Sequence, residues 1–162
     1  MERVSKINYY LDIAQTVAER STCLRKNYGA IIVKNDSIVS TGYNGAPRGR
    51  KNCSDIGYCM REKLNIPRGE RYEMCRSVHS EANAIIAASR EQMLDAELYM
   101  TCIDPATKEI VGGTNSCAMC KRMIINAGIK RVYIRDTKDE YRTVEVADWI
   151  GDDDSLTGIF GY

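Results

Sequence analysis

The 162-residue sequence contains a single histidine, His79, and Glu81 follows it two positions later. Further along the chain, Cys117 and Cys120 form a C-x-x-C pair. Thiolates and imidazole are preferred zinc ligands. The histidine and the cysteine pair each lie where a helix is expected to begin, and a helix N-terminus favours the thiolate form of cysteine. Two helix starts could therefore bring three ligands to one metal ion.

Three protein ligands leave one tetrahedral position for water, which is typical of a catalytic zinc. Zinc lowers the pKa of that water from about 15.7 to ~7, so that a nucleophile forms at neutral pH. Glu81 is near enough to reach the water and would carry its proton to a leaving amine. We expect a hydrolytic zinc site, with His79, Cys117 and Cys120 as ligands and Glu81 as the catalytic residue. Taken singly, the histidine could be structural, and the C-x-x-C could be a redox pair or half of a zinc ribbon.

The spacing of apolar residues predicts an α/β domain that would position these groups. It favours helices over 3–20, 79–93 and 117–128, and one further helix near the VEVADWI segment. Strands are expected on both sides of a tight turn at Asn35-Asp36, as an antiparallel hairpin, and again at 97–102 and 131–135. The order strand, helix, strand in the second half implies a parallel pair joined by a right-handed crossover.

Residues 44–76 interrupt this pattern with glycines, prolines, cysteines and many charges. A loop of this length is unusual unless it is functional or held in place, and a short helix is expected near 58–64. Four cysteines flank or occupy it: Cys23, Cys53, Cys59 and Cys75. They could bind a second, structural zinc that holds the loop, or they could be scattered free thiols. Cys102 lies in a strand and is expected to be a buried apolar residue.

Composition excludes several classes of protein. A net charge of +1 provides no strong field for nucleic acid or an acidic membrane, and the chain lacks an apolar run of the ~20 residues that span a bilayer. The first residues lack the apolar core of a signal peptide. We therefore expect one cytoplasmic domain over 1–162, with no nucleic-acid or membrane partner. Seven cysteines in a reducing compartment then indicate metal binding or redox chemistry rather than disulfides.

The motif H-x-E followed by C-x-x-C is the signature of the zinc deaminases, and the chain resembles that superfamily over nearly its full length. Within it, the segments RSTCLRKNYGAIIV, IVSTGYNGAPRG and VHSEANAI are similar to those of the deoxycytidylate (dCMP) deaminases. Two positions depart from the family pattern. Ser80 stands where alanine or a similar small residue is usual, and Ser116 replaces the proline before the cysteine pair. Ser116 is expected to cap the helix that follows.

This resemblance implies a three-layer α/β/α cytidine-deaminase-like fold, with a mixed five-stranded sheet that has an N-terminal antiparallel hairpin and parallel later strands. It implies that dCMP is hydrolysed to dUMP and ammonia, which would supply dUMP for thymidylate synthesis. A zinc-bound hydroxide would attack C4 of the base, and Glu81 would protonate N3 and the departing amine. Asn44, Ser21 and Tyr141 match substrate-binding positions of relatives. The alternatives are a turn asparagine for Asn44, a helix-end serine for Ser21 and a surface tyrosine for Tyr141.

The resemblance also implies a homo-oligomer, most often a hexamer, that dCTP with magnesium activates and dTTP inhibits. Arg48, Arg50 and Lys51 could hold such an effector or could be a solvated basic loop. Some relatives carry a second zinc near this loop. Two other functions stay open: a zinc deaminase of another nucleoside, base or nucleotide, and a catalytically silent zinc- or nucleotide-binding module.

Overall fold

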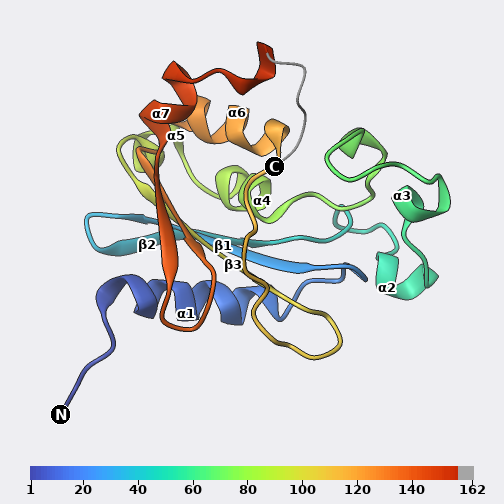
Figure 1. Ribbon diagram of the computed structural model, residues 1–162, viewed down its shortest axis with the longest axis horizontal. Helices are drawn as coiled ribbons and strands as arrows, with labels where there is room; N and C mark the ends of the chain where they lie inside the picture. Colours follow the sequence, from blue (N-terminus) through green and yellow to red (C-terminus); the bar gives the residue numbers. More distant parts are fainter. Residues whose placement is uncertain (157–162) are drawn as a thin grey trace.

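A five-stranded sheet forms the centre of the protein in the computed structural model, which describes residues 1–156 apart from the side chain of Ser155 (Figure 1). The strands are β1 (Asn27–Lys34), β2 (Ser37–Tyr43), β3 (Glu97–Ile103), β4 (Arg131–Arg135) and β5 (Tyr141–Glu145), in the spatial order β2-β1-β3-β4-β5. The pair β3/β4 is parallel, and the other three pairs are antiparallel. The predicted mixed sheet, its N-terminal hairpin and the later parallel pair are therefore confirmed.

The hairpin turn has the backbone that its sequence predicts. Asn35 and Asp36 both have positive φ angles, 50° and 59°. Asparagine and aspartate tolerate this left-handed conformation better than most residues, and a turn with two such residues matches the twist of the flanking strands.

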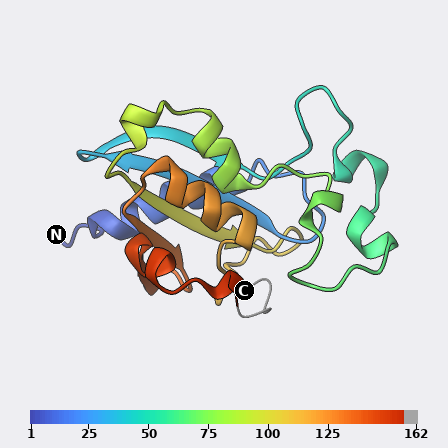
Figure 2. The ribbon, with the colours of Figure 1, turned by 90° about the horizontal axis from the view of Figure 1, so that it is seen from above.

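Helices cover both faces of the sheet, which gives the predicted three layers (Figures 1 and 2). α1 (Lys6–Ala18) packs on one face, where Tyr10, Leu11 and Ala14 bury their side chains against the strands. On the other face lie α4 (Ser80–Ile86), α5 (Arg90–Met93) and α6 (Ala118–Ala127). The larger apolar core lies beneath these three helices. Buried apolar residues pack α1 against one face of the sheet and α4 and α6 against the other. The sheet therefore fixes the positions of α4 and α6, whose N-termini bear the candidate metal ligands.

The helix expected over 79–93 is two helices, α4 and α5, and the single-helix prediction is wrong. Ser89 starts the second helix: its hydroxyl accepts from the backbone N–H of Gln92, and the Gln92 side chain accepts from the Ser89 backbone N–H. Such a capping box favours a new helix start over continuation. The fifth strand of the expected sheet, whose position the apolar spacing does not indicate, is β5, and it runs antiparallel to β4 before α7 (Val146–Gly151) and a short 3-10 turn η2 (Asp154–Leu156).

Residues 44–76 extend beyond one end of the sheet (Figure 2). They contain α2 (Cys53–Ile56), α3 (Met60–Lys63) and the 3-10 turn η1 (Tyr72–Met74), so the short helix expected near 58–64 is confirmed. A β-bridge between Gly45 and Val78 closes the base of the segment. The segment is therefore an ordered insertion with short helices rather than an irregular loop.

No helix within residues 1–156 combines the length and apolarity that crossing a membrane would require.

Candidate active site

The expected metal ligands lie together between α4 and α6. His79 immediately precedes α4 and Cys117 immediately precedes α6, with Cys120 in the first turn of α6. His79 Nδ1 is 3.4 Å from both Cys117 Sγ and Cys120 Sγ, and the three ligand atoms lie within 4.8 Å of one another. A tetrahedral zinc with bonds of ~2.0–2.3 Å would hold nitrogen and sulfur ligands roughly 3.5 Å apart. The donor set and its spacing therefore fit zinc.

The electrostatics of the cluster also favour a cation. Hydrogen bonding from Cys120 lowers the pKa of the Cys117 thiol to about 4. Burial opposes the charged form of His79, but its hydrogen bonds to Cys117 and Cys75 and the charge of Glu81 outweigh burial and raise its pKa to about 11. The same surroundings, above all the bond to Cys117 and burial, raise the pKa of the Cys120 thiol. The His79 imidazolium and the Cys120 thiol thus hold protons that a divalent cation would displace, whereas Cys117 is already a thiolate.

Glu81 points into this cluster from the first turn of α4. Its side chain is 4% exposed, and its charge contributes to the raised pKa values of both His79 and Cys120. The Ser80 hydroxyl donates a hydrogen bond to Glu81 Oε1 at 2.8 Å. Helix α4 therefore presents a metal ligand and an acid two residues apart to the same point, which is the arrangement that proton transfer beside a metal needs.

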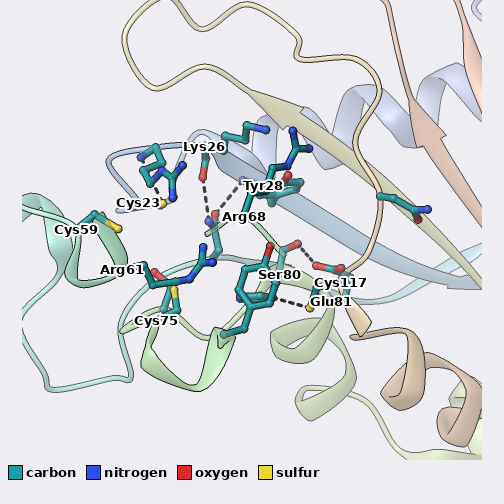
Figure 3. A pocket seen from close by; sticks show the side chains of 16 residues that line it. Cys23, Lys26, Tyr28, Cys59, Arg61, Arg68, Cys75, Ser80, Glu81 and Cys117 are labelled. Carbon is teal, nitrogen blue, oxygen red and sulfur yellow. Dashed lines mark hydrogen bonds between the residues drawn. The ribbon is translucent and has the colours of Figure 1, made fainter. Parts of the chain in front are cut away.

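Beside the cluster is a pocket lined by the described residues that Figure 3 shows as sticks. Glu81 and Cys117 lie on one side of it, and Cys23, Cys59 and Arg61 lie on the other (Figure 3). Four basic side chains line it: Arg25, Lys26, Arg61 and Arg68. Among these lining residues, Glu81 alone carries a carboxylate. The sequence does not indicate that these four side chains share one pocket, because Arg25 and Lys26 lie just before β1 whereas Arg61 and Arg68 belong to the 44–76 segment.

Arg61 is the most deeply placed of these cations. It is 6% exposed, and its Nη2 donates to the carbonyls of Pro67 and Glu70 at 2.8 Å each. Its Nε is buried without a partner in the described structure. The guanidinium carbon lies 4.3 Å from the centre of the Tyr72 ring, and that ring meets His79 edge-on at 5.3 Å between centroids. One stack of side chains thus connects the 44–76 segment to the metal cluster.

The three expected substrate-binding residues have different positions. Asn44 lines the pocket, but its side chain is already engaged: Oδ1 accepts from the Tyr28 backbone N–H and Nδ2 donates to the Lys26 carbonyl. Ser21 lies behind it, with its hydroxyl 2.5 Å from Asn44 Oδ1. Tyr141 lies in β5 and packs edge-on against Tyr133, on the face that α1 covers. Of the three, Asn44 belongs to the described pocket lining, whereas Ser21, which contacts Asn44, and Tyr141 do not.

The four cysteines of the expected second site lie before or within the 44–76 segment, and three of their thiols are close enough to affect the fourth, Cys53. Burial raises the pKa of the Cys53 thiol, and the nearby thiols of Cys23, Cys75 and Cys59 raise it further. All four are free thiols. In the part of the chain that is described, however, only His79, Cys117 and Cys120 have ligand atoms as close together as a metal requires. The four thiols are neighbours without forming a closed cage.

Two other sequence expectations have outcomes here. Cys102 is fully buried in β3, and burial raises its pKa to about 12, as expected for an apolar role. The predicted cap at Ser116 is wrong, because Cys117 occupies the N-cap position of α6. The buried Ser116 hydroxyl has no hydrogen-bond partner among the described residues.

A sheet flanked by two helices whose first residues supply H-x-E and C-x-x-C defines the class of zinc-dependent deaminases. Residues 4–135 match the sequence profile described as the cytidine and deoxycytidylate deaminase zinc-binding region. The chain belongs to this family, and the relatives described below are named deaminases.

A deoxycytidylate deaminase of Mycobacterium phage D29 is 36% identical over 82% of this chain and 95% of the phage protein. A deoxycytidylate deaminase of Schizosaccharomyces pombe is 33% identical over 80% of this chain, which spans 37% of that longer protein. The structure is similar to a dCMP deaminase from cyanophage S-TIM5 in its apo form, with a TM-score of 0.58, 28% identity and coverage of 85% of this chain and 88% of the other. The same cyanophage enzyme, solved with dCMP and dUMP, aligns with a TM-score of 0.54 at 26% identity over 83% of this chain and 84% of that one.

Proposed function

We propose that the protein is a dCMP deaminase, which hydrolyses dCMP to dUMP and ammonia. The observation that carries this proposal is the presence of four basic side chains in the same pocket as the His79–Cys117–Cys120 cluster and Glu81. A cytidine or free base lacks a phosphate and would not need them. The named phage and yeast relatives, and the cyanophage enzyme solved with dCMP and dUMP, support the same substrate.

His79, Cys117 and Cys120 would hold zinc, which when bound supplies an activated water as nucleophile. Glu81 would take a proton from the attacking water, so that the water oxygen can bond to C4 of the base. It would deliver that proton to N3, then take the proton of the new C4 hydroxyl and pass it to the exocyclic nitrogen, so that the C4–N bond breaks, ammonia leaves and the C4 carbonyl of dUMP remains. Its 4% exposure supports this role, because bulk water would compete for those protons.

The phosphate of the substrate would lie between the strand side and the 44–76 side of the pocket. Arg25 is held by an ion pair with Glu62 at 2.9 Å, which would position its guanidinium. Arg61 keeps a buried, unpartnered Nε among the described residues. Arginine presents several donors in a fixed plane and suits phosphate oxygens. Asn44 is proposed to contact the sugar. Its Oδ1 accepts from Ser21 and from the Tyr28 backbone, and its Nδ2 donates to the Lys26 carbonyl, which leaves the second Nδ2 hydrogen for the substrate.

The test is ammonia release from dCMP, CMP, deoxycytidine and cytidine at equal concentrations. We expect turnover of dCMP and little from the two nucleosides. Equal turnover of deoxycytidine and dCMP would contradict the assignment of a nucleotide substrate, and no turnover of any of the four would contradict the enzymatic function.

We further propose a second, structural zinc held by Cys23, Cys53, Cys59 and Cys75, because the other three thiols lie close enough to Cys53 to raise its pKa beyond the effect of burial. Binding would require the sulfurs to draw closer than they lie without metal. Zinc analysis of purified protein tests this, with near two per chain expected and near one contradicting it.

We also propose a regulatory nucleotide site and an oligomeric assembly. Arg48, Arg50 and Lys51 are exposed near the pocket-forming segment, which suits a site for dCTP with magnesium or for dTTP. We propose a cytoplasmic hexamer, a location with which seven free cysteines agree. Hyperbolic saturation by dCMP that neither dCTP nor dTTP alters would contradict the regulation, and light scattering would measure the assembly.

A further inference from the structure

The hydrogen bond between Ser80 and Glu81 is a contact that the general chemistry of the site does not require. Ser80 is fully buried, lines the pocket, and donates to Glu81 Oε1 at 2.8 Å (dashed in Figure 3). An alanine, the usual residue of the resembled family at this position, would occupy the same space without a donor. The hydroxyl of this chain therefore adds one specific contact to the proton carrier.

A glutamate side chain rotates about three bonds, and its carboxylate has two oxygens that exchange places by rotation. Proton transfer requires one of these oxygens to face the reacting atoms, and a small misorientation lowers the reaction rate. A hydrogen bond to a charged oxygen is stronger than one between neutral groups, so it can hold one orientation. Ser80 engages Oε1 and leaves Oε2 to move protons.

We propose that Ser80 is a positioning residue, which fixes the Glu81 carboxylate so that Oε1 is held and Oε2 serves the reaction. This inference deepens the proposed dCMP deamination and rests on it. The contact lies within one turn of α4, where Ser80 and Glu81 are adjacent, so it requires no movement of the 44–76 segment.

Ser116 provides a matched control. It is also a fully buried serine next to the metal cluster, adjacent to Cys117 as Ser80 is adjacent to His79. Its hydroxyl has no partner in the described structure. Ser116→Ala removes the same atom at the same depth without removing a contact.

In zinc-loaded protein we expect Ser80→Ala to lower kcat for dCMP about tenfold, with KM and zinc content unchanged. Ser116→Ala should change kcat by less than about twofold. A fall in kcat alone reports on the proton carrier, whereas general loosening of the site would also raise KM. Equal kcat values for the two variants would overturn the proposal.

Crystal structures of zinc-loaded wild type and Ser80→Ala supply a readout that does not depend on the substrate. We expect one Glu81 orientation bonded to Ser80 in the wild type, and more than one in Ser80→Ala. A zinc-loaded wild type in which Glu81 does not accept from Ser80 would overturn the inference even if dCMP is deaminated. Failure of the wild type to deaminate dCMP would instead overturn the proposed function, and the crystal structures would still decide the role of Ser80.

Discussion

The α carbon of Gly42 in β2 faces the backbone of Ser80 in α4 so closely that a Cβ on Gly42 would lie 2.4 Å from the Ser80 carbonyl oxygen. The same Cβ would lie 2.4 Å from the backbone nitrogen of Ala84. Both are backbone atoms of the helix that carries Glu81, so neither can move aside alone. The absence of a side chain at Gly42 therefore sets how closely α4 approaches the sheet.

Gly42→Ala should displace α4 and lower the free energy of unfolding by about 2 kcal/mol, as overpacking does. Activity per folded molecule should also fall, because His79 and Glu81 move with the helix. Gly29→Ala is the control: its Cβ would lie 2.0 Å from the Ala14 carbonyl oxygen of α1, on the opposite face. Urea unfolding should show a loss in both variants, and kcat a loss in Gly42→Ala alone. Full activity in folded Gly42→Ala would contradict this account.

The sequence predicted the parts of the site that lie close together along the chain. The H-x-E pair and the C-x-x-C pair each begin a helix, and the sequence indicates both helix starts, although not the end of α4 at Ile86. Arg61 could not be predicted as a pocket residue, because its placement depends on the carbonyls of Pro67 and Glu70 and on the Tyr72 ring. Long-range contacts of this kind leave no periodic pattern.

The sequence likewise predicted the parts of the fold that depend on local turns and on the order of elements, but not the position of β5 or the break between α4 and α5. The hairpin and the β3/β4 pair follow from turn residues and from the order of elements. The position of β5 was missed because its pattern is weak: its residues are only half-buried or exposed at the edge of the sheet. The break between α4 and α5 had a local signal, Ser89 followed by Gln92 three residues later, which the apolar spacing of 79–93 obscured.

Glu81→Gln tests the proton carrier. The amide keeps the size of the side chain but cannot accept and release a proton at neutral pH, so kcat should fall about 10³-fold. Zinc content should stay as in the wild type, because Glu81 is not one of the three clustered ligands. Ammonia release and zinc analysis of the same preparation measure both, and substantial turnover by this variant would mean that another group moves the protons.

Cys53→Ser tests the second zinc. Cys53 is the buried member of the four neighbouring cysteines, and the other three thiols all contribute to its raised pKa. We expect zinc content to fall from near two to near one per chain, with a lower thermal midpoint. Cys102→Ser, at a buried thiol of β3, should leave the zinc content unchanged. Identical zinc content in wild type and Cys53→Ser would exclude this residue as a ligand.

Asp136 predicts a pH dependence of stability. The Arg142 guanidinium donates to both of its oxygens, at 2.8 and 3.0 Å, and, despite partial burial, this hydrogen bonding lowers the pKa of the Asp136 carboxyl. Arg142 also donates to the Thr114 carbonyl, in the segment that leads to Cys117. A pKa that is lower in the folded than in the unfolded state stabilises the protein above the unfolded value of ~3.9, and this contribution is lost as pH falls through the folded value.

Asp136→Asn should therefore be less stable than wild type at pH 7, and the difference should shrink as the pH falls below about 4. Urea unfolding at a series of pH values measures it. Asp139→Asn, at an exposed position of the same turn, should show no such pH-dependent difference. A constant difference between Asp136→Asn and wild type across the series would mean that the charge of Asp136 is not the cause.

Arg61→Gln tests the phosphate end of the pocket. If Arg61 binds the phosphate, the variant should raise KM for dCMP about tenfold or more, because a charged hydrogen-bond donor to an anion is lost. The weak turnover of deoxycytidine, which carries no phosphate, should change far less. Arg71→Gln removes the same charge from the same segment, where Arg71 is exposed and paired with Glu73 at 3.2 Å, and should leave both substrates unaffected. Initial rates with the two substrates separate the outcomes: an equal loss for dCMP and deoxycytidine would show that Arg61 supports Tyr72 and the segment around it rather than the phosphate.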